Sequence, residues 1–306
     1  MLYDVLIAGG GPAGLSAALT LGRACKRVLL CDAGPRRNAA AVHVHNFVTR
    51  DGTPPDDFRR VAREQLAAYP AVEVRDAPVR QVTGARGAFR AEVGAEVVEA
   101  RRVLLCTGVV DDLPPVEGLA TLWGHAVFQC PYCHGWELKG RRWGYLAAAH
   151  NADHALAFVL QLRAWTPAVT LFTGGELPLD RDAEARLRAA GVSVEGGAVI
   201  RLIPAGSRLE AVELEDGRQV PCEVLFAHPR QRQVSLVQSL AVATDEHGYV
   251  VADAMRKETS VPGVYAAGDL TSRMQAAVAA AAAGMQARAM LNLDLTLASG
   301  TATSTA

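Results

Sequence analysis

The chain has 306 residues, of which 50% are hydrophobic and 21% are charged. This length predicts about two domains, and the composition is typical of a globular chain with ample apolar side chains for a core. The formal net charge is −1, which gives no electrostatic reason to expect binding to nucleic acid or to an anionic membrane.

Targeting signals are not expected either. No run of about 18 apolar residues occurs, and the N-terminus enters a strand-like pattern at once, so we expect neither a signal peptide nor a membrane anchor. We therefore expect a cytoplasmic protein. Six cysteines are too few for a disulfide framework at this size. Four of them lie in apolar patterns and are expected to be buried small hydrophobes: Cys25, Cys31, Cys106 and Cys222.

The N-terminal segment has the pattern of a dinucleotide-binding unit. An apolar run at 3–8 leads into Gly9-Gly10-Gly11-Pro12-Ala13-Gly14, a helical stretch, and a second apolar run that ends at Asp32. Strand, Gly-x-Gly-x-x-Gly, helix, strand and acidic residue form the dinucleotide fingerprint. Gly9 would make the turn, Gly11 would let backbone amides approach a pyrophosphate, and Gly14 would let the helix pack on the strand. Asp32 can accept hydrogen bonds from a ribose. The alternative is a glycine-rich turn in an unrelated α/β unit.

The central motif is Cys130-Pro131-Tyr132-Cys133-His134. A thiolate in a Cys-x-x-Cys pair is stabilised by its neighbour and by a helix N-terminus, and Pro131 stiffens the turn. A structural zinc site needs a second ligand pair, and the sequence has no second Cys-x-x-Cys. In a reducing cytosol such a pair is more often catalytic than structural. We therefore favour a redox dithiol over a zinc site or two core cysteines, and we predict no metal.

Two further apolar strands end in glycine motifs. One ends at Thr107-Gly108, and the other ends at Gly268-Asp269. An alanine-rich helix is predicted from about Gln275 to Leu293. The residues from Thr296 onward are small and polar without periodicity, which predicts a disordered tail.

These motifs, in this order, resemble the low-molecular-weight thioredoxin reductase family of FAD-dependent disulfide oxidoreductases over about residues 3–293. The stretch from Cys130 to Glu137 resembles more closely the dithiol oxidase branch of that family, the gliotoxin- and holomycin-type oxidases. The resemblance implies an α/β fold with two Rossmann-like three-layer domains, the Cys-x-x-Cys domain being inserted into a discontinuous FAD domain. We expect an FAD domain at 1–113 and 245–306, and a degenerate NAD(P)-type domain at 114–244.

The resemblance also implies a set of FAD-binding residues. Asp269 would reach the ribityl chain, and the helix beginning near Gln275 would aim its positive end at the flavin pyrimidine. Arg37, His45 and Asn46 fall in the loop that passes beside the flavin in this family, His45 replacing the usual Glu. A solvated loop charge and a turn residue are the alternatives for Arg37 and Asn46. The expected set is Gly9, Gly11, Pro12, Ala13, Gly14, Asp32, Arg37, His45, Asn46, Thr107, Gly108, Gly268, Asp269, Gln275 and Ala276.

The expected catalytic residues are Cys130, Cys133 and His134. The resemblance implies that Cys133 faces the flavin and that Cys130 is the interchange thiol. His134 stands where the family's reductases carry Asp. A histidine titrates near neutrality, so it can accept a proton from an incoming thiol. The alternative for His134 is a solvent-facing residue at a helix N-terminus.

The second nucleotide loop departs from the family. Ala147 and Ala149 stand at its first and second glycine positions, and a methyl group at the second position blocks close approach to a pyrophosphate. The next strand is followed by Gly174-Gly175-Glu176, where NADPH users place an arginine cluster, and the first basic residue is Arg181. We expect nicotinamide binding to be weak or absent, although alanine sometimes replaces a single glycine.

The leading hypothesis is an FAD-dependent dithiol oxidase that works through Cys130 and Cys133 and uses oxygen without NADPH. One alternative is a thioredoxin reductase-like enzyme driven by NADPH or by another donor, such as ferredoxin or a second flavin. The non-enzymatic alternative is a flavin-binding redox sensor. The expected partner is a small dithiol or disulfide, or a thioredoxin-like protein. The resemblance implies a homodimer.

Overall fold

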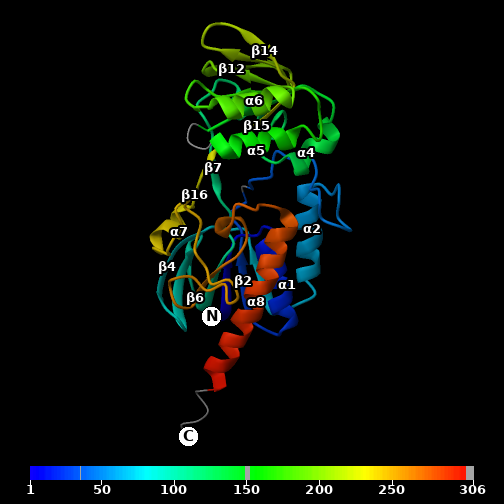
Figure 1. Cartoon of the computed structure of the whole chain (residues 1–306). Coiled ribbons are helices and arrows are strands. Elements are labelled where there is room, and N and C mark those ends of the chain that lie inside the picture. The colour runs from blue at the N-terminus through cyan, green and yellow to red at the C-terminus, as the bar shows by residue number, and fades with distance from the viewer. Residues whose placement is uncertain (35, 149–151, 301–306) are drawn as a thin grey trace. The chain divides into compact units, whose positions relative to one another are not determined.

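The computed structural model describes residues 1–34, 36–148 and 152–300. The chain forms two compact units, one comprising 1–110 and 231–306 and the other comprising 111–230. The second unit is thus inserted into the sequence of the first (Figure 1). Each unit is built on a sheet that contains adjacent parallel strands, together with helices, so the predicted α/β fold with an inserted second domain is confirmed.

The second unit ends at residue 230, earlier than the expected boundary at 244. Leu236, Val237 and Val242 are buried in the core of the first unit. Because their apolar side chains leave water there, the chain has rejoined the first unit well before 245. The sequence offers turn residues on both sides of this segment, and only the packing shows to which unit it belongs.

The first unit has a seven-stranded sheet in the order β3-β2-β1-β6-β5-β4, with β17 paired to β6. Its strands are β1 (Leu2–Ala8), β2 (Val28–Cys31), β3 (Val72–Arg75), β4 (Val79–Ala85), β5 (Ala88–Val93), β6 (Glu96–Leu105) and β17 (Val264–Ala266). The pairs of β1 with β2 and β6 are parallel, as are those of β2 with β3 and β6 with β17, whereas β4, β5 and β6 pair in antiparallel fashion. The carboxyl ends of β1, β2, β6 and β17 therefore meet at one edge.

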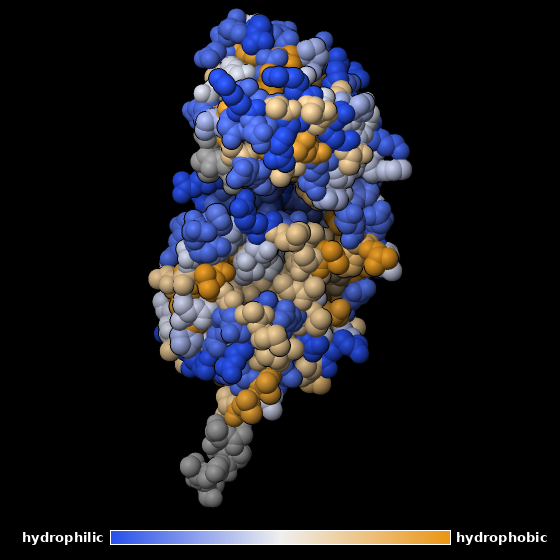
Figure 2. All heavy atoms as spheres, in the orientation of Figure 1, coloured by the Kyte–Doolittle hydropathy of each residue, from blue (hydrophilic) through white to orange (hydrophobic). Residues whose placement is uncertain are grey.

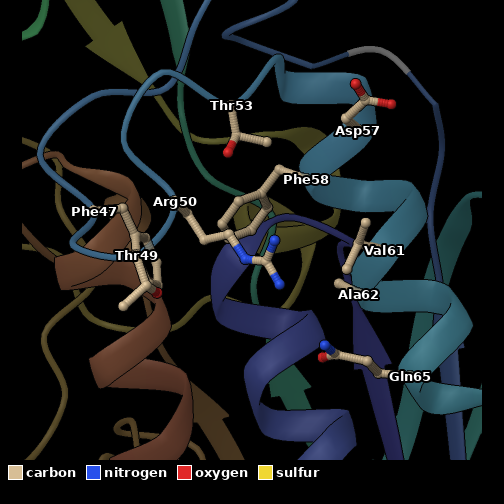
Figure 3. A pocket seen from close by; sticks show the side chains of 9 residues that line it. All are labelled: Phe47, Thr49, Arg50, Thr53, Asp57, Phe58, Val61, Ala62 and Gln65. Atoms are coloured by element: carbon tan, nitrogen blue, oxygen red, sulfur yellow. The ribbon is translucent and has the colours of Figure 1, made fainter.

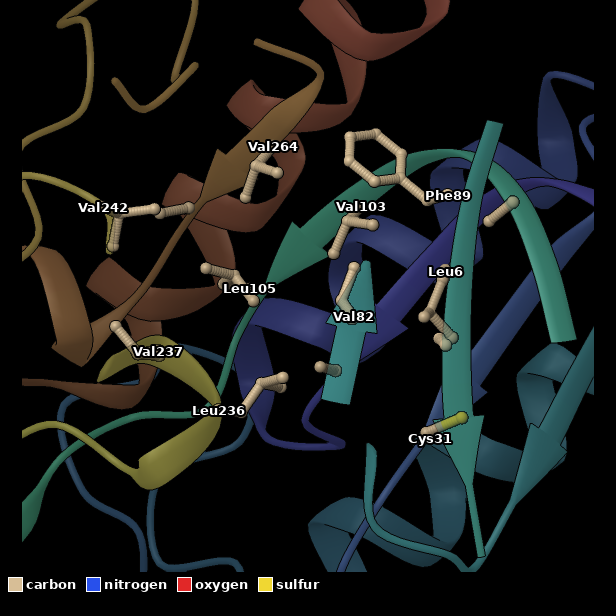
Figure 4. Close-up of a cluster of buried hydrophobic side chains, with 14 of the residues drawn as sticks. Leu6, Cys31, Val82, Phe89, Val103, Leu105, Leu236, Val237, Val242 and Val264 are labelled. Atoms are coloured by element: carbon tan, nitrogen blue, oxygen red, sulfur yellow. The ribbon is translucent and has the colours of Figure 1, made fainter. Parts of the chain in front are cut away.

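The central strands of this sheet are buried on both faces, and their side chains alternate between the two. Leu6 and Ala8 of β1 enter one core cluster, and Val5 and Ile7 enter the other. Figure 4 shows Leu6 in the first cluster with side chains from β4, β5, β6 and β17. Strands buried on both faces have continuous apolar runs, which explains the pattern of β1 in the sequence.

The helices of the first unit are α1 (Pro12–Arg23), α2 (Pro55–Leu66), the short α7 (Ser235–Ser239) and α8 (Ala277–Gly300), with a 3-10 turn at Asp269–Thr271. α8 runs beside α1 (Figure 1). A Cβ atom at Gly284 of α8 would collide with the backbone of Ala13 in α1, so glycine permits this close approach. α8 continues to Gly300, and the predicted disorder from Thr296 is wrong for 296–300, because Leu295 is buried against the core. Residues 301–306 lie outside the described residues.

The second unit has a five-stranded parallel sheet in the order β11-β10-β9-β15-β8. Its strands are β8 (Val127–Phe128), β9 (Trp143–Leu146), β10 (Val169–Phe172), β11 (Val192–Glu195) and β15 (Val224–Ala227), and a three-stranded antiparallel layer adds β12 (Val199–Ala205), β13 (Arg208–Leu214) and β14 (Gln219–Pro221). The helices are α3 (Leu119–Leu122), α4 (Pro131–Leu138), α5 (Ala152–Leu162) and α6 (Arg181–Ala189). The two connecting strands, β7 (Val110–Asp112) and β16 (Arg230–Arg232), pair with each other.

Among the described residues, no helix has both the length and the apolar character needed to cross a membrane.

An ion pair joins the long C-terminal helix to the sheet of the first unit. Arg102 of β6 is 2% exposed, and its guanidinium contacts the Asp294 carboxylate of α8, which also accepts a hydrogen bond from the Tyr265 hydroxyl at 2.8 Å. Burial acts to raise the pKa of Asp294, but the hydrogen bonds from Arg102 and Tyr265 outweigh it and hold this pKa below its usual value.

We expect Asp294→Asn to lower the free energy of unfolding by about 3 kcal/mol at pH 7, because the change leaves the Arg102 charge buried without its counterion. A carboxyl whose pKa is depressed in the folded state stabilises the fold above its unfolded pKa of about 3.9, and this contribution is lost as the pH falls through the folded pKa. Urea unfolding between pH 7 and pH 3 measures both effects. Asp216→Asn, which affects an exposed pair with Arg218, is the control and should change stability by less than about 1 kcal/mol. A loss no larger than that of the control would contradict the role given to Asp294.

Candidate active site

The glycine loop between β1 and α1 has the geometry of a phosphate cradle. Gly9 has a φ of +116°, and a Cβ there would collide with the carbonyl oxygen of Cys106. A Cβ at Gly14 would collide with the carbonyl oxygen of Gly9. Gly11 caps α1, Pro12 occupies its first turn, and a Cβ at Gly11 would meet no atom within 4 Å. The loop is therefore tight on its protein side and open at Gly11, where the helix N-terminus favours an anion.

Asp32 follows β2, and its carboxylate is held by two arginines of α2. Asp32 is 7% exposed, and Arg59 and Arg63 both form ion pairs with it. The backbone N–H of Gly34 donates a further hydrogen bond to it at 3.2 Å. Burial, followed by repulsion from Arg63, lowers the pKa of Arg59. Sequence reasoning identified Asp32 but missed both arginines, for which the only signal is their four-residue spacing on one helix face.

A second set of predicted residues meets in a hydrogen-bonded network. Arg37 donates to the Gln275 side-chain oxygen and lies 3.7 Å from the Asp269 carboxylate. The amide nitrogen of Gln275 donates to the Gln231 side-chain oxygen at 2.7 Å. The Tyr249 hydroxyl donates to the same oxygen at 2.7 Å. The structure thus brings together three residues that the sequence predicted, and it adds Gln231 and Tyr249, which carry no motif.

The remaining predicted positions line the carboxyl ends of β6 and β17. Thr107 and Gly108 follow β6, and Gly108 has a φ of +65°. The Thr107 hydroxyl is buried and has no hydrogen-bond partner within the described residues. Gly268 has a φ of +97°, and a Cβ there would lie 3.0 Å from that of Ala13. A buried hydroxyl next to an open glycine loop is what a polar cofactor would satisfy, so these residues fit FAD.

His45 and Asn46 lie in the loop before α2 and are both held by Asp51. The Asn46 backbone N–H donates to the Asp51 carboxylate at 2.7 Å, and the His45 Nδ1 atom lies 3.3 Å from it. The hydrogen bond from Asn46, followed by that from His45, lowers the pKa of Asp51. Asn46 has a φ of +63°. Their contact with a cofactor stays a prediction, as does that of Ala276, whose carbonyl accepts from the Ala280 N–H as α8 begins.

A cavity of about 210 Å³ lies between this loop and α2 (Figure 3). The rings of Phe47 and Phe58, 5.4 Å apart, form part of its wall beside Arg50. None of the predicted site residues lines it, so it adds nothing to the candidate site.

The dithiol lies in the second unit, at the start of α4. Cys130 and Cys133 form a disulfide with Cα atoms 5.4 Å apart, which is an ordinary separation for a disulfide. Cys130 is the N-cap residue of α4 and Pro131 is in its first turn, so the helix N-terminus can stabilise a thiolate there. α4 packs tightly, because a Cβ at Gly135 would lie 2.8 Å from the Trp165 ring nitrogen.

His134 is partly buried in α4, and its ring stacks on Phe128 with centroids 4.4 Å apart. The contact places an imidazole one residue after Cys133, in the position that the sequence predicted. Its role as a base stays a prediction.

The other cysteines differ from the dithiol in their surroundings. Burial raises the pKa of Cys31 and of Cys222 to about 12 and also raises that of Cys106, so these thiols stay protonated and unreactive. Cys25 is exposed, and its predicted burial is wrong. It lies beyond the end of α1 with a φ of +56°, where the turn carries it away from the core.

The second nucleotide loop is only partly described. Ala147 follows β9, whereas Ala149 lies outside the described residues. After β10, Glu176 is exposed, Asp180 caps α6 by accepting from the Ala183 N–H at 2.7 Å, and Arg181 begins that helix. Two acidic side chains therefore precede the first basic one at this end of β10, and negative charges there disfavour a 2′-phosphate.

Comparison with known proteins gives consistent matches over the whole chain. The family model described as pyridine nucleotide-disulphide oxidoreductase matches residues 3–284. The thioredoxin reductase tcpT of Claviceps purpurea is 31% identical over 96% of each chain. The crystal structure of an oxidoreductase from Agrobacterium tumefaciens has a TM-score of 0.90 and 38% identity, covering 97% of this chain and 99% of that one. The crystal structure of HlmI has a TM-score of 0.89 and 34% identity, covering 98% and 95%.

Proposed function

We propose that this chain, which belongs to the pyridine nucleotide-disulphide oxidoreductase family, is a dithiol oxidase that uses oxygen and needs no NADPH. It is an FAD-dependent oxidoreductase that acts on disulfides. The observation that carries the proposal is the contrast between its two nucleotide loops. The first loop has all three glycines and is open at Gly11. The second has alanine at the first and second glycine positions, Ala147 and Ala149, and acidic side chains where a 2′-phosphate would need cations.

FAD would be held by the residues predicted for it. The backbone amides at Gly11, Pro12 and Ala13 would face the pyrophosphate, and Asp32 would accept from a ribose hydroxyl. Arg37, Asp269 and Gln275, which already form one network, would hold the flavin end. Thr107, Gly108, Gly268, His45, Asn46 and Ala276 complete the set. When bound, FAD would supply the two-electron redox chemistry that links the reduced dithiol to oxygen.

The dithiol would exchange with substrate in two steps. A substrate thiolate attacks the Cys130 sulfur, so a mixed disulfide forms while Cys133 leaves as a thiolate. The second substrate thiol then attacks the substrate sulfur, which closes the substrate disulfide and releases Cys130 as a thiol. His134 would accept the proton of an incoming thiol. Two electrons have then moved from the substrate into the Cys130–Cys133 pair.

A thioredoxin reductase-like activity driven by NADPH or another donor is the second candidate, and the name of the relative tcpT favours it. In that case the electrons would run from the donor through the dithiol to a thioredoxin-like protein. For the oxidase that we propose, the preferred substrate is a small dithiol.

The distinguishing experiment adds dithiothreitol and NADPH separately to the FAD-loaded protein. We expect oxygen uptake and stoichiometric peroxide with dithiothreitol alone, since the dithiol supplies both electrons. Under anaerobic conditions NADPH should leave the flavin absorbance band unchanged, whereas dithiothreitol should bleach it. Rapid bleaching by NADPH would show that the second loop still binds a nicotinamide nucleotide and would favour the reductase.

We also propose a cytoplasmic homodimer. Figure 2 shows apolar side chains along the exposed side of α8, where Val278, Met285 and Leu293 are 41–51% exposed. Apolar side chains gathered on a surface are typical of an interface. Light scattering coupled to size-exclusion chromatography would give twice the 32.4 kDa chain mass for a dimer.

A further inference from the structure

A cluster of three titratable side chains lies at the carboxyl edge of the second sheet. Tyr145 is on β9, His228 directly follows β15, and His154 is in the first turn of α5. The Tyr145 hydroxyl and the His154 Nε2 atom lie 3.0 and 3.3 Å from the His228 Nδ1 atom. In a dinucleotide fold this edge, with the helix that follows β9, would receive the pyrophosphate.

His228 connects this cluster to the dithiol. Its Nε2 atom lies 3.1 Å from the carbonyl oxygen of Gln129. That carbonyl belongs to the peptide bond whose nitrogen is the backbone nitrogen of Cys130, the N-cap of the helix that carries both cysteines. No sequence motif indicates this contact, because Gln129, the Tyr145–His154 segment and His228 are far apart in the chain.

The hydrogen-bond directions follow from the groups involved. A carbonyl oxygen only accepts, so the His228 Nε2–H donates to Gln129. In neutral His228 the Nδ1 atom must then accept, from the Tyr145 hydroxyl or from the His154 Nε2–H. A further proton on Nδ1 would be shared with the His154 nitrogen 3.3 Å away. The two imidazoles can thus hold one proton between them.

The cluster is packed in aromatic surroundings. The centroid of the Phe158 ring lies 4.5 Å from that of the His228 ring and 4.7 Å from that of the Tyr145 ring. Tyr145 is 1% exposed. Low polarity strengthens the interaction between a charge in the cluster and a charge on the dithiol. The other titratable and charged side chains on the surrounding elements are Tyr132, His134 and Glu137 on α4, Asp153 on α5, and Arg230 and Arg232 on β16.

We propose that His228, backed by His154 and Tyr145, is a positioning residue that holds a proton released by substrate oxidation and thereby keeps one cysteine of the reduced pair as a thiolate. The inference rests on the proposed dithiol chemistry and deepens it. Oxidation of a substrate dithiol forms one substrate S–S bond, breaks the Cys130–Cys133 bond and moves two electrons. Of the two protons released, one stays on a cysteine sulfur as a thiol. The other, which His134 accepts first, then resides on the His228–His154 pair. The resulting thiolate and imidazolium balance in charge.

The test measures the reactivity of the dithiol against pH. The anaerobic, fully reduced holoenzyme is treated with iodoacetamide from pH 5 to pH 9, and mass spectrometry follows the peptide that carries Cys130. We expect His228→Gln to slow alkylation at pH 6.5 about tenfold, which corresponds to a rise of one unit in the thiolate pKa. Glutamine keeps a donor for the Gln129 carbonyl but cannot hold the proton. If His228→Gln kept the wild-type dependence of alkylation on pH, the hydrogen bond to Gln129 would have only a structural role, and the proposal would be overturned.

Two further variants keep the test decisive. Tyr145→Phe and His154→Gln change the Nδ1 side of His228 without altering its bond to Gln129, and both should slow alkylation at pH 6.5 in the same direction. If His228→Gln fails to fold, these two variants replace it in the test. An unchanged dependence of alkylation on pH in both would then overturn the proposal. The control is His247→Gln, a half-exposed histidine of the first unit, which should leave the profile unchanged. Because alkylation needs no oxygen or nicotinamide, a failed oxidase assay would leave this result standing.

Discussion

Replacing either cysteine of the Cys130–Cys133 pair by serine is expected to reduce dithiol turnover by about three orders of magnitude or more. The reaction requires both sulfurs, because one forms the mixed disulfide and the other must leave as a thiolate. Loss of a group that acts as part of a unit removes nearly the whole advantage of the unit. Oxygen uptake with dithiothreitol measures the loss directly.

The two single variants also separate the roles of the two sulfurs. If Cys130 is the interchange thiol, Cys133→Ser should accumulate a mixed disulfide with a small thiol, detectable as added mass on the Cys130 peptide. Cys130→Ser should accumulate much less. The matched control is Cys25→Ser, since Cys25 is an exposed thiol outside the pair, and it should keep full turnover. Retention of more than about a tenth of the activity in either dithiol variant would contradict the proposed chemistry.

The second large effect concerns the glycine loop, where two substitutions should separate cofactor binding from folding. Gly11→Ala adds a methyl group that meets no protein atom within 4 Å, so the stability of the FAD-free protein should change by less than about 0.5 kcal/mol. The methyl group would nevertheless occupy the space through which the pyrophosphate approaches the backbone. We expect the FAD dissociation constant to rise at least about tenfold, as measured by titration of the FAD-free protein.

Gly14→Ala should behave differently. Its methyl group would collide with the carbonyl oxygen of Gly9, so the helix or the loop must shift, and the FAD-free protein should lose about 1–3 kcal/mol of stability. Gly196→Ala is the control, because Gly196 has open space around it and no positive φ. If Gly11→Ala binds FAD like the wild type, the cradle is not where the cofactor lies.

The parts of the molecule that could be predicted are those in which one short segment determines the geometry. The loop from Gly9 to Gly14 was predictable, because its turn and its helix packing each exclude a side chain at a fixed position. The dithiol was predictable for the same reason, since two residues between cysteines allow the disulfide ring.

The parts that could not be predicted depend on contacts between distant segments. Gln231 and Tyr249 join the Gln275 network only because the chain returns to the first unit before them. His228 reaches Gln129 because β15 lies beside β8 in the sheet, although 99 residues separate the two in sequence. The exposure of Cys25 depends on where α1 ends, and helix ends are poorly defined by apolar patterns. Strand pairing, side-chain burial and the ends of helices and units are determined by the packing of segments that are distant in sequence.

The close contact of Gly284 with Ala13 has a consequence for biosynthesis. Proteins are made from the N-terminus, and domains fold as units once their residues have emerged. The inserted unit, 111–230, is complete while β17 and α8 of the first unit are still to be made. The nascent chain therefore carries a finished dithiol unit before the helix that packs against α1 exists. Gly268, Asp269 and Gln275, which are proposed to hold FAD, also belong to this late-made part of the chain, so we expect FAD capture to follow completion of the inserted unit.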